Sequence, residues 1–415
     1  MKLSPALQHR ALWVAGAIFL AVYYLRFLKG AGLEVFTGAA HCMLNGDTPL
    51  HCKSVIFAYP PLFALLSIVL TAMPTWLREA FWYLMLVGTL FVSMRLCEAL
   101  ALRLFPGQWT ERQLAWLRVL SLVLPLKFIL AVFENQAYDS ISFVFIPLGL
   151  LALSKRRWIR GGASLAVAAS LKVTPLIFLP YLLFKRRFAG AAAFVVVLVV
   201  LSVLPDILVP PHQGTHIGAW VREVLLGPFF VDPTKVALPF WVTDSPMNQS
   251  FHAAVARLIN ERTEPQLFAT AYRVVVLIYA ACVGAIMLKS VRDDRLVAVD
   301  GALLVISGLL MSPVSSQSHF VGLMLPYTLL AAAFIRDAAM RPFYFVTVGL
   351  SFVLATATSN DGVGRAFTGW ALEHNFPVWG TLLLVVPLGA LIWSVRAREP
   401  AASPPLGAGS INSTT

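Results

Sequence analysis

Long apolar runs separated by short basic clusters constrain this chain more than any other feature of its sequence. Of its 415 residues, 59% are hydrophobic and only 13% are charged, whereas a soluble domain carries about 25% charged residues. Most of the apolar runs approach the length of about 20 residues that a helix needs to cross a bilayer. They are continuous rather than alternating, and backbone polar groups must be satisfied within the lipid, so the sequence predicts an all-α polytopic membrane protein.

The candidate spans are strongly apolar and are bounded by polar or basic residues. They are residues 11–28, 58–74, 80–101, 188–208, 267–288, 296–312, 318–335, 342–358 and 377–395. Two more apolar segments, 114–133 and 162–184, are interrupted by prolines and lysines, and a further one covers 139–154. Counted as crossings or re-entrant hairpins, these segments make about 9 to 13 transmembrane or re-entrant helices.

The net charge of +12 does not indicate nucleic-acid binding, because the basic residues are clustered between apolar runs. The clusters are Lys155-Arg156-Arg157, Lys185-Arg186-Arg187, Arg292 to Arg295, and Arg396 with Arg398. Clusters of this kind mark the cytoplasmic side of a bacterial inner-membrane protein. The run 11–28 is not followed by a small-residue cleavage site, so it is predicted to be a first span and not a removed signal peptide.

These clusters predict a topology with the N-terminus inside, a first outer loop at 29–57 and a second at 209–266. In that topology, residues 114–133 enter and return on the outer side. Residues 162–184 form a hairpin with both ends inside and Lys172 near its tip. The topology conflicts with the charge rule at one place, because it leaves Arg103, Arg112 and Arg118 outside.

The chain is predicted to form a single integral membrane domain over residues 1–398. Residues 399–415, rich in Ala, Pro, Ser and Gly, are predicted to be a disordered cytoplasmic tail, because they hold too little apolar surface to fold.

The first outer loop combines carboxylates and cysteines between two apolar runs, which suggests chemistry at a membrane surface. It carries Glu34 and Asp47, and Tyr59 precedes two prolines where the next apolar run begins. If the loop is periplasmic, Cys42 and Cys52 can form a disulfide; two free thiols are the alternative.

Lys172 lies inside an apolar hairpin, where an ionisable side chain is costly and is by default a functional candidate. Its alternative is snorkelling of the long side chain to the nearest membrane interface.

Four blocks of sequence, in this order and spacing, resemble one family of membrane enzymes. They are GLEVFTGAAHCMLNGDTPL with FAYPPLFALL, ENQAYDSISFVFIPLGLLALSKRR, GGASLAVAASLKVTPLIFLPYLLFKRR, and SPMNQSFHAAVARL with LMSPVSSQSHFVGLMLPY. Over most of residues 11–335 they resemble the GT-C polyprenyl-phosphate-sugar-dependent glycosyltransferases, specifically the α-mannosyltransferase-like family. The resemblance implies a GT-C-like helical fold with large extracytoplasmic loops and transfer of a sugar from a polyprenyl monophosphate outside the cytoplasm.

The resemblance also implies a carboxylate base that takes the proton of the acceptor hydroxyl. The family places an Asp at the start of the first loop, where this chain has Gly32. Glu34 is the nearest carboxylate and is the first candidate for the base, and Asp47 is the second. The alternatives are an interfacial role for Glu34 or a family member that has lost activity.

The departing lipid phosphate needs cationic or N–H donors. Lys172 is the first candidate, followed by His319, which stands where the family usually shows two histidines, and then by Arg273. A solvated cap is the alternative for His319, and snorkelling is the alternative for Arg273.

Candidate sugar-binding or acceptor-binding residues are polar or aromatic side chains within the matching blocks. They are Asn135, Gln136, Asn248, Gln249 and Tyr59. Capping of a helix break is an equal alternative for Asn135 and Gln136. No required cofactor or metal is expected, although Glu134 and Asp139 are weaker candidates for the base or for an optional divalent cation.

The sequence therefore predicts a glycosyltransferase of the bacterial inner membrane that faces the periplasm and acts in glycolipid biosynthesis. Its expected partners are a polyprenyl-phosphate sugar, with mannose as the first candidate for the sugar, a lipid-linked or glycan acceptor, and membrane lipids. The rival hypothesis is a non-catalytic relative, such as a lipid-linked sugar flippase or a binding subunit, and Gly32 is its main support.

Overall fold

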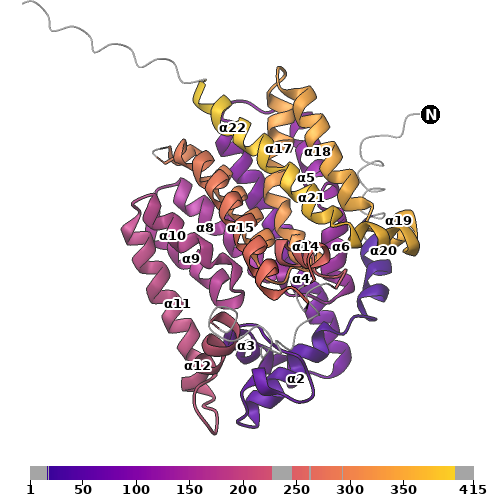
Figure 1. The fold of residues 1–415 in the computed structure, drawn as a ribbon, viewed down its shortest axis with the longest axis vertical. Helices are drawn as coiled ribbons and strands as arrows, with labels where there is room; N and C mark the ends of the chain where they lie inside the picture. The colour runs from indigo at the N-terminus through magenta and orange to yellow at the C-terminus, as the bar shows by residue number, and fades with distance from the viewer. Residues whose placement is uncertain (1–15, 17, 227–244, 261–262, 292, 398–415) are drawn as a thin grey trace, which may run out of the picture.

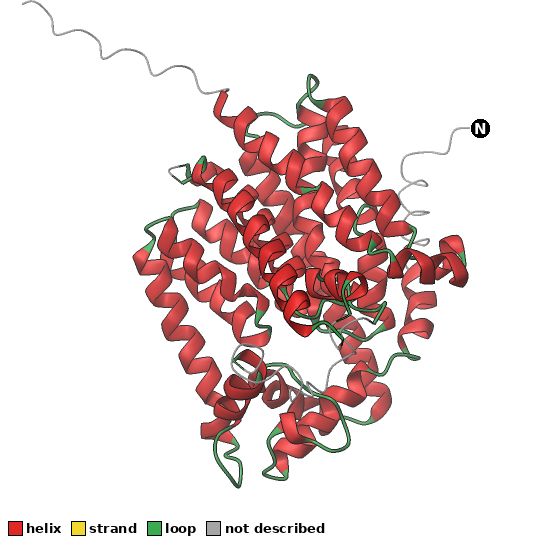
Figure 2. Cartoon of the chain, in the orientation of Figure 1, coloured by secondary structure: helices red, strands yellow, loops and turns green. Residues whose placement is uncertain are grey.

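The computed structural model of the protein describes residues 16, 18–226, 245–260, 263–291 and 293–397. Throughout this part of the chain the regular secondary structure is helical and no strand occurs (Figure 2). The predicted all-α polytopic membrane fold is therefore confirmed. The predicted tail at 399–415 and part of the predicted second outer loop lie outside the described residues.

Five described helical segments are long and apolar enough to cross a membrane. Three of them are single helices: α4 (Thr75–Leu104), α11 (Phe188–Leu208) and α15 (Pro265–Leu288). The fourth, Gln317–Arg336, comprises η5 (Gln317–Leu323) and α17 (Met324–Arg336). The fifth, Phe376–Val395, lies in α21 (Phe376–Leu383) and α22 (Val385–Ala397). A bent pair, α5 (Glu111–Val123) and α6 (Leu126–Glu134), makes a sixth candidate, with an angle of 49° at the break. Pro125 lies at this break and accounts for it, because proline cannot donate the helical hydrogen bond.

Shorter apolar helices pack among these spans. They are Ile18–Phe27, α3 (Pro61–Thr71), Asp139–Ser154, which comprises α7 (Asp139–Phe143) and α8 (Phe145–Ser154), Thr174–Phe184, which comprises η2 (Thr174–Ile177) and α10 (Phe178–Phe184), and α18 (Arg341–Thr356). Two further helices, α9 (Trp158–Leu171) and α16 (Val297–Met311), complete the surroundings of the site.

The basic clusters gather at one end of the molecule, which is the upper end in Figure 1. Arg156 and Arg187, from two different clusters, both pair with Asp294. Arg336 donates a hydrogen bond to the carbonyl of Gln108 at 2.9 Å. We call this the basic end; it comprises residues 105–112, 155–157, 185–187, 293–295 and 336–341.

The hairpin predicted at 162–184 is present. Helix α9 leaves the basic end at residues 155–157 and runs to Lys172, and η2 and α10 bring the chain back to residues 185–187. The hairpin packs tightly on α11, since a Cβ atom at Gly162 would lie 1.9 Å from the carbonyl oxygen of Gly190. No side chain fits at that crossing.

The predicted re-entrant pair at 114–133 is wrong, because residues 58–74 do not form a full span. Helix α3 has 11 residues, about 16 Å at 1.5 Å per residue, and it packs beside α2 (Gly32–Leu44) far from the basic end (Figure 1). Helix α4 then runs to the basic end, because its early residue Trp82 donates to the carbonyl of Gln136 and its late residue Arg103 donates to that of Ser154.

Helices α5 and α6 consequently run from the basic end to the opposite end. Arg103 and Arg112 belong to the basic end, and Arg118 pairs with the buried Glu98 at 3.0 Å within the bundle. The conflict with the charge rule disappears. The predicted topology counted one crossing too many at residues 58–74 and one too few at residues 114–133. The two errors cancel, so the predicted sidedness of the later segments is unchanged.

The cysteine pair of the first loop forms the expected disulfide. Cys42, in α2, is bonded to Cys52, just after η1 (Pro49–His51), and the two Cα atoms are 6.0 Å apart. Cys97 is buried and Cys282 is exposed, both as free thiols.

Removing this disulfide with Cys42→Ser and Cys52→Ser should destabilise the first loop. Closing a loop of this length restricts the unfolded chain and contributes about 3 kcal/mol in the chain-entropy model. We expect a lower Tm for the double variant in detergent, and the same decrease for the native protein under reductant. Cys282→Ser, an exposed free thiol, is the matched control and should leave the Tm unchanged. An unchanged Tm in the double variant would contradict the prediction.

Candidate functional site

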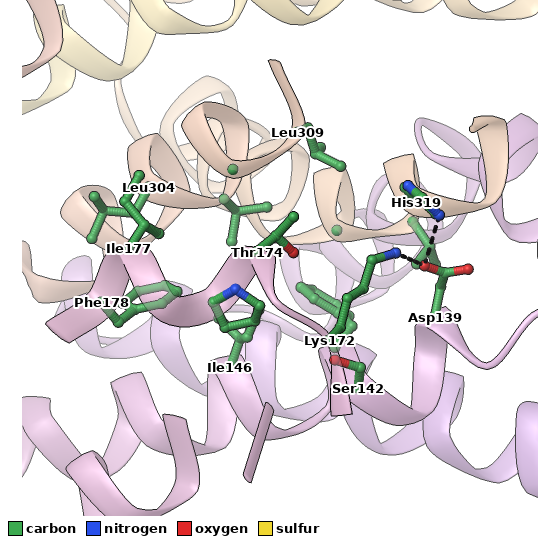
Figure 3. Close-up of a pocket in the computed structure, with 16 residues that line it drawn as sticks. Asp139, Ser142, Ile146, Lys172, Thr174, Ile177, Phe178, Leu304, Leu309 and His319 are labelled. Carbon is green, nitrogen blue, oxygen red and sulfur yellow. Dashed lines mark hydrogen bonds and ion pairs between the residues drawn. The ribbon is translucent and has the colours of Figure 1, made fainter. Parts of the chain in front are cut away.

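A cavity of about 50 Å³ lies at the tip of the α9–α10 hairpin (Figure 3). Asp139, Lys172 and His319 meet at one end of it, and apolar side chains such as Phe178 and Leu304 line the rest. These residues come from α7, the end of α9, α10, α16 and η5, so the cavity lies between elements that are distant in the sequence.

Lys172 reaches the cavity because α9 ends there. Its backbone is extended, with φ −147°, and Pro175, three residues later, cannot continue the helix. Two carbonyls in the last turn of α9 accept hydrogen bonds from residues at the start of α7: the Tyr138 hydroxyl donates to Leu171 O at 3.0 Å, and the Ser142 hydroxyl donates to Ala168 O at 3.3 Å. These two bonds place the start of α7 against the end of α9.

Asp139 is the centre of the cluster. It begins α7, its side chain is 5% exposed, and its Oδ1 atom accepts a hydrogen bond from the Lys172 ammonium. His319 Nε2 lies 3.8 Å from the same oxygen, and the Ser318 hydroxyl also hydrogen-bonds the carboxylate. A buried charge is tolerated when it is paired and hydrogen-bonded in this way.

The orientation of His319 assigns its proton. Its Nδ1 atom accepts a hydrogen bond from the Ser316 backbone N–H at 3.3 Å. In the neutral imidazole the proton is therefore on Nε2, the nitrogen that faces Asp139. The Lys172 ammonium donates to Asp139 Oδ1, and His319 Nε2 faces the same oxygen at 3.8 Å.

Aromatic rings form the wall behind Asp139. Tyr138 stacks on Phe63 with ring centroids 3.9 Å apart and meets Tyr59 edge-on at 4.9 Å. Phe36 of α2 contacts Tyr138 at 5.8 Å. Tyr59 lies within electrostatic range of the Asp139 carboxylate, so the structure places this predicted site residue beside the cluster.

The carboxylates predicted as bases lie elsewhere. Glu34 is exposed on α2, and Asp47 is exposed in the turn that follows it. A Cβ atom at Gly32 would be 2.4 Å from the carbonyl oxygen of Asn135, so this backbone has no room for an acidic side chain there. Arg273 is exposed on α15 rather than at the cavity.

Asn135 and Gln136 have structural contacts. The buried Gln136 accepts from Leu33 N–H at 2.9 Å and donates to Phe27 O at 2.8 Å, which caps the start of α2 and the end of the first helix. The exposed Asn135 donates to Ala131 O within its own helix. Of the two alternatives, the contacts favour capping.

Asn248 and Gln249 are buried and bonded to backbone. The Asn248 amide donates to Pro313 O at 2.9 Å and accepts from Ser315 N–H at 3.0 Å. Gln249 donates to Leu372 O at 2.9 Å. Asn248 therefore shapes the loop that leads to His319 rather than the cavity itself.

The sequence pointed to Asp139 only weakly, yet it is the carboxylate that the structure brings to Lys172 and His319. The available signal was a carboxylate at the start of an apolar helix, which is a functional candidate by the same argument as Lys172. Glu134, its neighbour in the sequence, lines a different cavity.

Spanning helices that enclose a buried cluster of carboxylate, ammonium and imidazole define the class: an all-α polytopic membrane protein with an internal polar site. A model of glycosyltransferase family 87 matches residues 57–313, which is more than half of the chain. The chain belongs to glycosyltransferase family 87. The family-level resemblance seen in the sequence is thereby confirmed, and the match includes Asp139 and Lys172.

Two similar proteins share the name polyprenol-phosphate-mannose-dependent alpha-(1-2)-phosphatidylinositol pentamannoside mannosyltransferase. The protein from Mycobacterium tuberculosis (strain CDC 1551 / Oshkosh) is 27% identical over 274 residues, which cover 64% of this chain and 56% of that protein. The protein from Mycolicibacterium smegmatis (strain ATCC 700084 / mc(2)155) is 23% identical over 340 residues, 72% of this chain and 74% of that protein. The chain thus spans little more than half the length of the first relative.

Proposed function

We propose that this protein transfers a hexose, with mannose as the first candidate, from a polyprenyl-phosphate donor to a lipid-linked or glycan acceptor. The observation that carries the proposal is the Asp139–Lys172–His319 cluster on an apolar-walled cavity between membrane helices of a family 87 chain. The names of the two relatives support both a phosphate-linked mannose donor and a lipid-linked acceptor.

The cluster suits the departing phosphate. The Lys172 ammonium and His319 Nε2–H converge on Asp139 Oδ1, and a phosphate oxygen can take the place of that carboxylate oxygen as their acceptor. Donors that are already oriented and shielded from water stabilise developing negative charge strongly. The apolar lining, with Phe178 and Leu304, suits the adjoining prenyl chain.

The reaction also needs a proton acceptor. The acceptor oxygen forms a bond to the anomeric carbon, the bond from that carbon to the phosphate oxygen breaks, and the hydroxyl proton passes to a carboxylate. We assign Asp139 as the first candidate, because it is the carboxylate that lines the cavity in the described part of the chain. Glu34 and Asp47 stay proposed as alternatives that require a rearrangement of the first loop.

The orientation follows from the charge rule, which places the basic end in the cytoplasm. Residues 139–154 connect the cluster to the basic end, a path of about 22 Å at 1.5 Å per residue. A bilayer core is about 30 Å thick, so the cavity belongs near the outer face. We therefore propose transfer on the periplasmic side of a bacterial inner membrane.

An in vitro transfer assay tests the proposal and the base together. Purified protein receives radiolabelled polyprenyl-phosphate mannose and a native membrane lipid extract, beside the variants Asp139→Asn, Glu34→Gln and Asp47→Asn. We expect labelled product from the native protein and from the latter two variants, and about 10²-fold less or lower from Asp139→Asn. A Tm measurement verifies that Asp139→Asn is folded.

Two results would change the assignment. Loss of product in Glu34→Gln or Asp47→Asn alone would transfer the base to that residue. Absence of product with several polyprenyl-phosphate sugars, together with movement of unchanged donor across proteoliposome membranes, would favour the flippase alternative.

A further inference from the structure

A second, larger cavity of about 430 Å³ lies far from the basic end. Its lining residues come from the end of helix Ile18–Phe27, from α6, and from α19 (Asn360–Val363) and the residues beside it. Eight residues line it: Arg26, Lys29, Lys127, Glu134, Ser359, Asn360, Asp361 and Arg365.

The lining has four cations and two carboxylates, which leaves two positive charges in excess. Both carboxylates lie on a single arginine: Arg26 pairs with Glu134 at 3.5 Å and hydrogen-bonds Asp361. Within the described part of the chain, Lys29, Lys127 and Arg365 have no ion-pair partner. The cavity therefore carries a net charge of +2 and three described cations without an ion-pair partner. This charge is complementary to that of a phosphate group.

Lys127 is the most informative of these cations. It is half-buried near the start of α6, in an apolar segment where an unpaired ammonium is costly. The next residue, Phe128, stacks on Phe320 at 5.2 Å, immediately beside His319. Helix α6 therefore lies between the two cavities. The Lys127 side chain lines the second cavity and not the first.

The outer surface of the helix beside this cavity is apolar. Val22 and Leu25 are exposed on the helix that carries Arg26, and Leu28 is exposed directly after it; such a face suits hydrocarbon chains. Lys127 lies seven residues before Glu134, about 10 Å deeper at 1.5 Å per residue. The long Lys127 side chain can extend from this depth toward the rim of the cavity, where the phosphate of a lipid headgroup lies beside the exposed apolar face.

We infer that this cavity binds the phosphate of an anionic membrane lipid in the leaflet opposite the basic end, with the acyl chains along the exposed face of the first helix. Lys127 and Arg365 hold the phosphate from two sides, and Lys29 adds attraction from the rim. Arg26, already engaged by Glu134 and Asp361, orders the cavity wall. The site is separate from the Asp139 cluster and does not depend on the transfer reaction.

A binding measurement on the full-length protein in detergent tests this inference. The probe is short-chain phosphatidic acid, followed by native mass spectrometry, with phosphatidylcholine as the zwitterionic comparison. We expect preferential binding of phosphatidic acid and at least about tenfold weaker binding by Lys127→Gln/Arg365→Gln, which loses two charge-assisted contacts. Lys53→Gln, an exposed lysine outside the cavity, is the matched control and should bind as the native protein does.

A single variant and a competition measurement complete the test. Lys29→Gln alters an exposed side chain and should weaken binding severalfold even if the double variant does not fold. Inorganic phosphate identifies the source of the anion: competition by phosphate at the concentration of the lipid would overturn the lipid assignment in favour of a free anion. Equal affinity in the native protein, Lys29→Gln and the folded double variant would overturn the site itself.

Discussion

Lys172→Gln is expected to reduce sugar transfer by about 10²- to 10³-fold, the usual effect of removing one oriented donor from a developing oxyanion. The Lys172 side chain is 12% exposed and its ammonium pairs with the Asp139 carboxylate, so the uncharged glutamine of the variant leaves the cavity without this cation. We expect the loss mainly in kcat, because the negative charge on the phosphate grows as the sugar departs.

Lys172→Gln also leaves Asp139 without its cation, so stability has to be measured beside activity. The double variant Lys172→Gln/Asp139→Asn removes the unpaired charge; we expect it to recover the Tm while staying inactive. Lys155→Gln, an exposed lysine at the basic end, should keep native activity. Native turnover by a folded Lys172→Gln protein would remove Lys172 from the mechanism.

Lys185→Met is expected to lower the free energy of unfolding by about 3–5 kcal/mol, the cost of breaking a buried ion pair from one side. Lys185 and Asp300 are 3% and 0% exposed, and their charged atoms are 2.8 Å apart. The Tyr181 hydroxyl donates to the same carboxylate at 3.2 Å, and Lys185 also donates to the Ser290 carbonyl. This network fastens the hairpin to the α15–α16 connection at the basic end.

A double variant distinguishes the cost of an unpaired Asp300 charge from the cost of altered side-chain packing. Lys185→Met/Asp300→Leu removes both charges and should recover most of the lost stability, because apolar side chains of similar volume can replace a buried pair. Thermal and denaturant unfolding in micelles measures both variants, with Lys155→Met as the exposed control. A double variant as unstable as Lys185→Met alone would show that the lost stability does not come from an unpaired Asp300.

The helical membrane fold could be predicted from sequence because its causes are local. Continuous apolar runs have few structural solutions in lipid, and the clusters at 155–157 and 185–187 predicted a hairpin with both ends on one side. Lys172 at the tip and the Cys42–Cys52 bridge followed from similar short-range reasoning.

The number of crossings before α7 could not be predicted in the same way. Residues 58–74 and 114–133 have the composition of spans, yet α3 is a short helix packed on α2, and α5 and α6 form one bent crossing. Composition reports that a segment is apolar, but not whether lipid or protein surrounds it. Only packing against the rest of the chain decides that.

The class of protein, the hairpin and the position of Lys172 at its tip could be read from the amino-acid sequence, because apolar length and charge position act within one segment. The tertiary structure alone decided what Lys172 meets: Asp139 is 33 residues away and His319 is 147 residues away along the chain. The carboxylate at the cavity is Asp139, whereas Glu34 on α2 and Asp47 after α2 are exposed away from it. The partner of a buried charge is chosen by the contact of distant helices, and no local spacing records that contact.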